Sequence, residues 1–258
     1  MTEAILEGVL DAEIAGPMDV IIGEPVEARR IHLADKYGVG TSSDNVAALD
    51  GAEAVVLAVK PQNLDEVMHT LKGNLEPTQM ILSIVAGVQL NTLIEGLSHP
   101  AVVRVMPNTP AQIRAGMTVW TASLDVAGDS LSLARDILGT LGKEWYVGDE
   151  NLMDMATALS ASGPAYVFLF VEALIDAGVY MGMPREMARE LVLETVLGSA
   201  RFVKESGGHP AALKDMVSSP GGGTVEALKV FEQRAFHGTV VDAVYAAYRK
   251  YRALGEQS

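Results

Sequence analysis

The residues best suited to bind a ligand form a glycine-rich stretch, Ser218-Ser219-Pro220-Gly221-Gly222-Gly223-Thr224. Three consecutive glycines leave the main chain uncovered and permit positive φ angles. If a helix begins near Thr224, its unpaired N–H groups and positive dipole end face this stretch, an arrangement that binds a carboxylate or phosphate without a cation. The alternative is a flexible turn between helices that Thr224 caps. The Ser219-Pro220 pair restricts the backbone, which argues against a flexible turn, so both interpretations stay open.

Two further candidates follow strand-like runs. Lys60 comes directly after the apolar run 54–59, where an ammonium group could pair with a pyrophosphate or a substrate group. From the sequence alone, a solvent-facing lysine is the stronger alternative. Asn108 lies between Pro107 and Pro110, which fix the backbone around it. Its side chain either faces a ligand, the interpretation that we favour, or closes a local Asx-turn.

The sequence offers few candidate residues for acid–base catalysis or metal binding. The five histidines are scattered, cysteine is absent, and no Gly-x-Ser-x-Gly sequence or Ser-His-Asp order stands out, so we expect no metal site and no nucleophilic triad. Carboxylate pairs such as Asp149-Glu150 and Glu186/Glu190 are expected to be solvated. Hydride transfer suits this inventory, because a cofactor supplies the reactive group while the protein supplies position and field.

These residues lie among alternating strand-like and helix-like segments. Strands are predicted at 19–22, 54–59, 80–85, 101–106, 117–121 and 144–147, and helices at 25–37 and 129–141. The middle three strands are continuous apolar runs, typical of strands buried on both faces. The alternation predicts a Rossmann-like, doubly wound parallel sheet. Ligands bind such sheets beyond the carboxyl ends of the strands, where Lys60, Ala86-Gly87 and Asn108 fall.

From about residue 149 the strand signal disappears. Helices are predicted at 154–162, 164–181, 184–206 and 238–254. The helix from Pro164 is apolar on every side, which is typical of a helix buried all round. In a helical part of this size the simplest way to bury it is against a second chain, so we predict a homodimer. A central core helix within one chain is the alternative.

Composition narrows the class of protein. The chain has 258 residues, of which 49% are hydrophobic, and a net charge of −14. That length suits one large domain or two modest ones. A protein with so negative a net charge repels nucleic acid. The apolar runs at 54–59 and 167–171 are too short for a bilayer, and the first residues do not look like a signal peptide. We therefore expect a cytoplasmic protein without a membrane segment.

Four motifs occur in order along the chain: Leu57–Gln62, Val103–Ala111, Leu159–Tyr166 and Val217–Thr224. Together they resemble pyrroline-5-carboxylate reductase over essentially the whole chain. The resemblance implies a dinucleotide-binding domain, residues 1–148, followed by a helical dimerisation and substrate domain, residues 149–258. It implies reduction of 1-pyrroline-5-carboxylate to L-proline, the last step of proline biosynthesis. The implied cofactor is NADPH, or NADH in some members, and dimers of this family often assemble into rings of five.

The resemblance also assigns site residues. The implied cofactor contacts are Asn45, Ala58, Val59, Lys60, Pro61, Ala86 and Gly87. Asn108, in the loop after the predicted strand 101–106, is a further predicted cofactor contact. The implied substrate contacts are Val217, Ser219, Gly222, Gly223 and Thr224. The hydroxyl of Thr224 is expected near the ring nitrogen, which makes it the candidate catalytic residue.

The beginning of the chain departs from the family pattern. The family starts with a strand and a glycine-rich turn before its first helix, whereas residues 1–10 here already look like that helix. We therefore expect an N-terminally incomplete dinucleotide-binding domain, with a gap between neighbouring strands. Glu24 favours a ribose 2′-hydroxyl, whereas Arg29 and Arg30 favour a 2′-phosphate, and the family inclines the choice to NADPH.

Three other functions remain open at this point. The chain could be a reductase for another cyclic imine or a related β-hydroxyacid-type dehydrogenase. It could be a catalytically impaired oligomeric homologue. It could also be a phosphate-binding module that uses residues 220–224.

Overall fold

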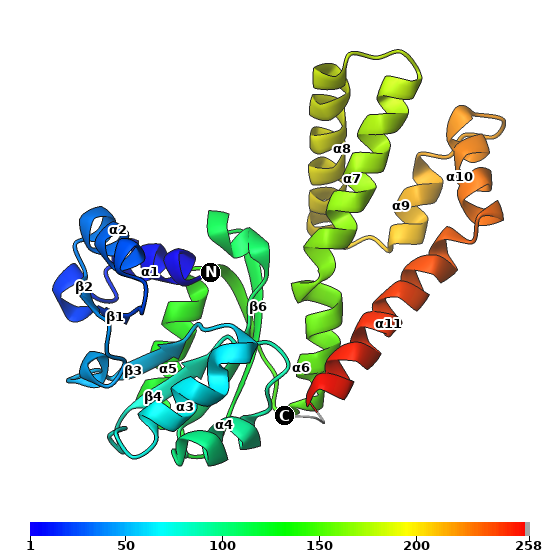
Figure 1. The fold of residues 1–258 in the computed structure, drawn as a ribbon. Coiled ribbons are helices and arrows are strands. Elements are labelled where there is room, and N and C mark those ends of the chain that lie inside the picture. The colour runs from blue at the N-terminus through cyan, green and yellow to red at the C-terminus, as the bar shows by residue number, and fades with distance from the viewer. Residues whose placement is uncertain (256–258) are drawn as a thin grey trace. The chain divides into compact units, whose positions relative to one another are not determined.

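The computed structural model describes residues 1–255, which form two compact units (Figure 1). The first unit comprises Met1–Ser162 together with the chain from Ala247 onward, and the second comprises Gly163–Ala246. The chain passes between the units within helices, once at Gly163 and once inside the last helix.

The first unit contains two sheets. The strands are β1 (Ile21–Gly23), β2 (Gly40–Ser42), β3 (Ala54–Leu57), β4 (Met80–Ser83), β5 (Val102–Met106), β6 (Gly116–Ala122) and β7 (Gly142–Tyr146). Strands β1 and β2 pair in parallel, and the other five form one sheet in sequence order. In that sheet β3, β4 and β5 are parallel, β6 runs antiparallel to β5, and β7 is parallel to β6. The prediction of a wholly parallel sheet was therefore wrong at β6 and β7, which both run opposite to β3, β4 and β5.

The helices of the first unit pack on both sheets. They are α1 (Thr2–Asp11), α2 (Glu27–Tyr37), α3 (Leu64–Leu71), α4 (Leu90–Leu97), α5 (Gly128–Gly139) and α6 (Asn151–Ala156). On the five-stranded sheet, α1 and α5 lie on one face and α3, α4 and α6 on the other (Figure 1), whereas α2 packs beside β1 and β2. On β4, Leu82 faces the first layer and Ile81 the second, as strand alternation requires. The predicted doubly wound architecture is confirmed.

Helix α1 joins the two sheets. Ile5 packs into the core of the five-stranded sheet, and the next residue, Leu6, packs into a separate core with Leu33 and Val39 beside β1 and β2. The predicted gap between neighbouring strands is present, because the two-stranded and five-stranded sheets are separate. As a consequence β3 is an edge strand, and Ala54, rather than being buried on both faces, is only partly covered.

The second unit is wholly helical. A π-helical turn, η5 (Thr157–Ala161), leads from α6 into α7 (Gly163–Tyr180). The remaining helices are α8 (Arg185–Ser206), α9 (Pro210–Met216), α10 (Gly223–Gln233) and α11 (Phe236–Gly255). Helices α7 and α8 cross where Gly178 meets Ala188, so closely that a Cβ added to Gly178 would stand 2.8 Å from the Ala188 Cβ.

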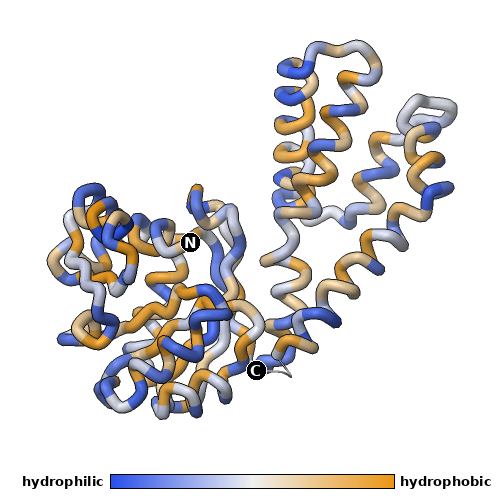
Figure 2. Tube along the Cα trace, viewed as in Figure 1, coloured by the Kyte–Doolittle hydropathy of each residue, from blue (hydrophilic) through white to orange (hydrophobic). Residues whose placement is uncertain are grey.

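The second unit has almost no core of its own. Within 163–246, all of which the structure describes, only Gly178 and Ala188 are buried. On α7, Phe168 is 62% exposed and Leu169 is 67% exposed. Apolar residues run along α7, α8, α10 and α11 (Figure 2). The alternative of a central core helix within one chain is therefore wrong, and the apolar surface of α7 is left for another molecule to cover.

One stretch, Asn151–Tyr180, is long and apolar enough to cross a membrane, judged by length and composition alone. The uninterrupted apolar runs are short, as expected, and the length of this stretch comes from α6, η5 and α7, which follow one another along the chain.

Candidate functional site

The predicted cofactor residues gather at one edge of the sheet in the first unit. The segment Ala58–Pro61 follows β3, Ala86-Gly87 follows β4, and Asn108 follows β5. These strands are parallel neighbours, with Leu57 opposite Ser83 and Ser83 opposite Arg104. Their carboxyl ends therefore lie side by side, at the edge where doubly wound sheets bind ligands.

The turn after β3 is short and exposed. Lys60 has an extended backbone and precedes a 3₁₀ turn, η3 (Pro61–Asn63), which runs directly into α3. Proline suits this first position because its missing N–H has no partner to lose there. The ammonium group of Lys60 forms no ion pair with any residue among 1–255. It is therefore available to a ligand, while the solvent-facing alternative stays open.

The turn after β4 requires glycine at one position. Gly87 is buried and has a φ of +77°, a conformation that residues with a Cβ rarely adopt. A Cβ added there would also stand 3.4 Å from the Leu254 Cβ, at the end of α11. The neighbouring Ala86 is exposed. The main chain of this turn is thus shaped and partly open, as a contact with a ribose would need.

Asn108 links β6 and η5 through hydrogen bonds of its side-chain amide. Its Oδ1 accepts a hydrogen bond from the Met117 N–H at 2.9 Å, and its Nδ2 donates to the Ser160 carbonyl at 3.3 Å. A local Asx-turn onto Pro110 is excluded because proline has no N–H. Contact of Asn108 with a cofactor remains a prediction, since both ends of the amide already bond within the protein.

Asn45 lies against the end of β1. Its Oδ1 lies where a Cβ of Gly23 would be, so a side chain at that position would displace the Asn45 amide. Glu24, which follows Gly23, accepts a hydrogen bond from the Val26 N–H at 2.9 Å, and its Oε2 lies 3.6 Å from the Arg29 Nε. Arg30 donates to the carbonyl oxygens of Glu24 and Pro25. A carboxylate and two guanidinium groups therefore lie together at the end of β1, and neither the negative nor the positive charge prevails there.

The predicted substrate residues lie together in the second unit. Ser219-Pro220-Gly221-Gly222 forms a tight turn in which the Gly222 N–H donates to the Ser219 carbonyl at 3.0 Å. Proline second and glycine third, with a φ of +73° at Gly221, are typical of a type II turn. The turn is therefore shaped rather than flexible, which follows from the Ser-Pro pair.

Helix α10 begins directly after this turn. Gly222 is its N-cap, no side chain caps it, and the alternative in which Thr224 serves as the cap is wrong. The first bond to Gly222 comes from the Val225 N–H, and no acceptor among residues 1–255 faces the N–H groups of Gly223 and Thr224. Both residues are exposed. Two adjacent donors at the positive end of a helix suit a carboxylate.

A buried ionic cluster was missed by the sequence analysis. The Arg104 side chain, on β5, is 2% exposed and donates to Glu150 Oε1 and Asp154 Oδ1, each at 2.8 Å. Glu150 was expected to be solvated with Asp149, and that expectation was wrong. The signal was present in Val102-Val103-Arg104-Val105-Met106, because a charged residue within an apolar strand requires buried partners.

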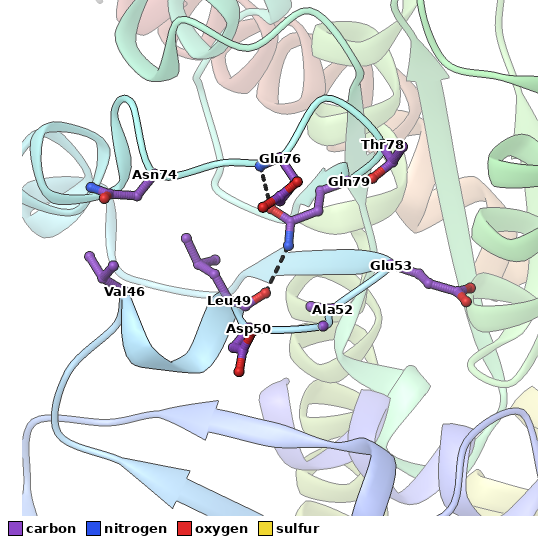
Figure 3. Close-up of a pocket in the computed structure, with 10 residues that line it drawn as sticks. Val46, Leu49, Asp50, Ala52, Glu53, Asn74, Glu76, Thr78 and Gln79 are labelled. Atoms are coloured by element: carbon purple, nitrogen blue, oxygen red, sulfur yellow. Dashed lines mark hydrogen bonds between the residues drawn. The ribbon is translucent and has the colours of Figure 1, made fainter.

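A hollow of about 480 Å³ lies at the opposite edge of the sheet, beside the amino ends of β3 and β4 (Figure 3). Its floor is held by Gln79, which donates to the Leu49 carbonyl at 2.8 Å and accepts from the Glu76 N–H at 2.9 Å. Asp50, Glu53 and Glu76 line it and would repel a dinucleotide phosphate, so we do not assign the cofactor here. Among residues 1–255, no cluster of three or more His, Asp or Glu side chains could hold a metal ion.

Comparisons with known proteins agree along the whole chain. The family model described as pyrroline-5-carboxylate reductase dimerisation matches residues 150–254, and the model described as NADP oxidoreductase, coenzyme F420-dependent, matches residues 1–87. A pyrroline-5-carboxylate reductase of Synechocystis sp. is 44% identical over 257 residues, covering 100% of this chain and 96% of that protein. One of Escherichia coli is 35% identical, covering 99% of this chain and 95% of that protein.

A solved structure shares the fold. The crystal structure of Plasmodium falciparum pyrroline carboxylate reductase with NADP bound superposes with a TM-score of 0.89 at 33% identity. The match covers 98% of this chain and 94% of that one. Sequence, fold and helical unit all agree, and the chain belongs to the pyrroline-5-carboxylate reductase family.

Proposed function

We propose that this chain reduces 1-pyrroline-5-carboxylate to L-proline, with NADPH as the hydride donor. The observation that carries the proposal is the pair of unpartnered N–H groups, on Gly223 and Thr224, at the start of α10. They follow a shaped, exposed glycine turn. The substrate is a small cyclic imine with a carboxylate, and these donors offer that carboxylate a fixed anchor.

The strand-end edge of the first unit fits a nicotinamide dinucleotide. The buried Gly87 has a positive φ that gives its turn a fixed shape, and Lys60 offers a cation without an ionic partner among the described residues. The residues that would hold the cofactor are Asn45, Ala58, Val59, Lys60, Pro61, Ala86, Gly87 and Asn108. When bound, its reduced nicotinamide supplies a hydride to C5 of the imine.

The residues of the second unit position the substrate. The N–H groups of Gly223 and Thr224 bind the carboxylate, beside Gly222, Ser219 and Val217, and so fix the orientation of the ring. The Thr224 hydroxyl lies near the ring nitrogen and accepts a hydrogen bond while that nitrogen is protonated. Thr224 is not a general acid, because an alcohol is a poor proton donor near neutrality. Binding energy of the carboxylate is thus used to orient the reacting carbon.

The choice between NADPH and NADH depends on the corner at the end of β1. The Arg30 guanidinium is held by two carbonyl oxygens and can serve as a fixed partner for a 2′-phosphate. The Glu24 carboxylate is already engaged by the Val26 N–H and approaches Arg29, which reduces its repulsion of that phosphate. These contacts support NADPH as the preferred donor and NADH as the weaker one.

The second unit supports a homodimer. The dimerisation family covers residues 150–254, which include the exposed apolar residues of α7 and α8. A partner helix would cover Phe168 and Leu169 and would explain the apolar length of Asn151–Tyr180 without a membrane. We extend the proposal to rings of five dimers, a cytoplasmic location, and a division into residues 1–148 and 149–258.

Turnover tests the proposal directly. The purified full chain should oxidise NADPH when 1-pyrroline-5-carboxylate is added, and form L-proline in equal amount. A six-membered cyclic imino acid should react much more slowly, which distinguishes a reductase for another imine. Binding of neither NADPH nor NADH would contradict the proposal and favour an impaired oligomeric homologue. Competition of phosphate with proline for the α10 turn, without turnover, would favour a phosphate-binding module.

A further inference from the structure

A buried guanidinium links two segments that carry predicted site residues, the turn after β4 and the loop after β5, with helix α6. The Arg104 side chain is almost completely enclosed, and two of its nitrogens donate to carboxylates of α6 at 2.8 Å. No residue among 1–255 accepts a hydrogen bond from its Nε. Burying a charge is costly unless it is paired, and even a paired buried charge rarely stabilises a fold more than an apolar residue would. Stability alone therefore does not account for an arginine here.

The two carboxylates make different contacts. Glu150 Oε1 accepts from Arg104 Nη1 and also from the Leu90 N–H, each at 2.8 Å. Leu90 is the first residue of α4, so this carboxylate satisfies one of the unpaired donors at the start of that helix. Asp154 lies one turn further along α6 and bonds to Arg104 Nη2; within residues 1–255, no hydrogen bond or ion pair joins it to α4. Within residues 1–255, the hydrogen bonds of Arg104 thus reach α4 through Glu150 alone.

The segment before α4 is the turn with Ala86 and Gly87. Only Val88 and Gln89 separate Gly87 from Leu90, so the position of the first turn of α4 fixes where that turn lies. At the other end of the network, β5 leads to Asn108, which bonds to the Ser160 carbonyl on η5. One buried charge therefore connects the turn after β4 with the loop after β5 and with the helix leading to α7.

We propose that Arg104 is a positioning residue for the cofactor: by holding Glu150 on the first turn of α4, it fixes the Ala86-Gly87 turn against the nicotinamide ribose. The inference rests on the proposed function for the identity of the cofactor. The positioning itself is a property of the protein without ligand.

Two conservative variants separate positioning from general stability. Glu150→Gln keeps the shape of the side chain but removes the charge that holds both Arg104 and the Leu90 N–H. Asp154→Asn removes a charge from the same guanidinium without touching α4. We expect Glu150→Gln to raise the Kd for NADPH about tenfold, the equivalent of one charge-assisted hydrogen bond, and to change kcat less than about twofold. Asp154→Asn should change the same Kd less than about twofold.

Hydrogen exchange of the Leu90 amide gives a readout that needs neither cofactor nor turnover. In the full chain without ligand, Glu150→Gln should accelerate that exchange about tenfold, whereas Asp154→Asn and the exposed control Glu205→Gln should leave it near wild type. Arg104→Met should behave as Glu150→Gln does, and if it fails to fold, the two carboxylate variants still decide the question.

Two results would overturn the inference. One is unchanged Leu90 exchange and unchanged NADPH affinity in Glu150→Gln. The other is an equal loss of affinity in Glu150→Gln and Asp154→Asn, because that would indicate general loosening rather than control of one turn. A wild-type chain that binds no NADPH would instead contradict the proposed function, and the exchange measurement would still test the positioning.

Discussion

At the scale of single residues, the glycines before α10 are not equivalent. A Cβ on Gly222 would stand 3.0 Å from the Ser219 carbonyl oxygen, so a side chain there disturbs the turn itself. A Cβ on Gly223 meets nothing within 4 Å. A side chain at Gly223 would therefore obstruct a ligand without disturbing the turn.

This difference allows a clean test of the carboxylate anchor. We expect Gly223→Val to raise the KM for 1-pyrroline-5-carboxylate by about tenfold or more, because the branched side chain covers the two free N–H groups. Gly128→Val is the matched control, since Gly128 is the first residue of α5 and also faces open space. Steady-state kinetics and thermal unfolding of both variants check the result. An unchanged KM in Gly223→Val would count against the anchor.

The Thr224 hydroxyl has a separate expected effect. Thr224→Ala should lower kcat about tenfold, the equivalent of one hydrogen bond to the ring nitrogen, and should leave the dimer intact. Thr239→Ala, on the exposed side of α11, removes a hydroxyl that bonds only to the Ala235 carbonyl and serves as the control. Kinetics at saturating substrate provide the measurement. Equal rates for Thr224→Ala and wild type would remove Thr224 from the mechanism.

Residue types predicted some contacts and missed others. The glycine turn and the proline-framed Asn108 were found because glycine and proline restrict or free the backbone locally. The partners of Asn108 were not found, because Met117 and Ser160 come from other segments. Glu150 was misjudged for the same reason: a carboxylate at a helix start looks solvated until the strand that supplies Arg104 is placed beside it.

At the scale of elements, an ionic cluster fastens α1 to α2. The Tyr37 hydroxyl lies 2.9 Å from Glu3 Oε2 and 2.6 Å from Glu7 Oε1, and Lys36 pairs with both carboxylates. Hydrogen bonding by Tyr37 lowers the pKa of Glu3 to about 2, and burial raises the pKa of Tyr37 itself to about 12. Because α1 packs on both sheets, this cluster also holds the smaller sheet in place.

The cluster predicts a dependence of stability on pH. The pKa of Glu3 in the folded state lies below its ordinary value of 4.5, so its stabilisation is complete above that value and is lost as the pH falls toward 2. Tyr37→Phe should lower the free energy of unfolding by about 1.5 kcal/mol at neutral pH, and less in acid. Thermal unfolding between about pH 7 and pH 3 measures this difference.

Tyr180→Phe is the control, because Tyr180 is 94% exposed. A difference between Tyr37→Phe and wild type that stays constant with pH would contradict the assignment to Glu3.

The element pattern was predictable where local chemistry decides it. The apolar strand runs, the end of α2 at Gly38 and the start of α10 within the run of three glycines follow from periodicity and backbone preference. The direction of β6 was missed although the sequence holds the clue: only residues 107–115 connect β5 to β6, and a parallel neighbour needs a crossover of about a dozen residues or more. The three-residue β2 carries too little pattern to be found.

At the scale of the molecule, the second unit requires a partner. Phe168 and Leu169 on α7 expose more apolar surface than an isolated helical unit would tolerate in water. We expect Leu169→Glu to weaken the dimer about 100-fold or more, because a carboxylate buried against apolar helices is unpaired.

Leu124→Glu provides the comparison, since Leu124 is fully exposed in the first unit. Sedimentation of both variants over a range of concentrations measures the dimer Kd. A dimer of unchanged strength in Leu169→Glu would show that α7 is not the interface.

The central claim is that the main chain at the start of α10 holds the acid group of the substrate. A crystal structure of the dimer with L-proline tests it most directly. The account predicts the proline carboxylate within hydrogen-bonding distance of the N–H groups of Gly223 and Thr224, with the ring nitrogen near the Thr224 hydroxyl. Proline bound at any other place, with these two N–H groups bonded to protein or solvent alone, would contradict it.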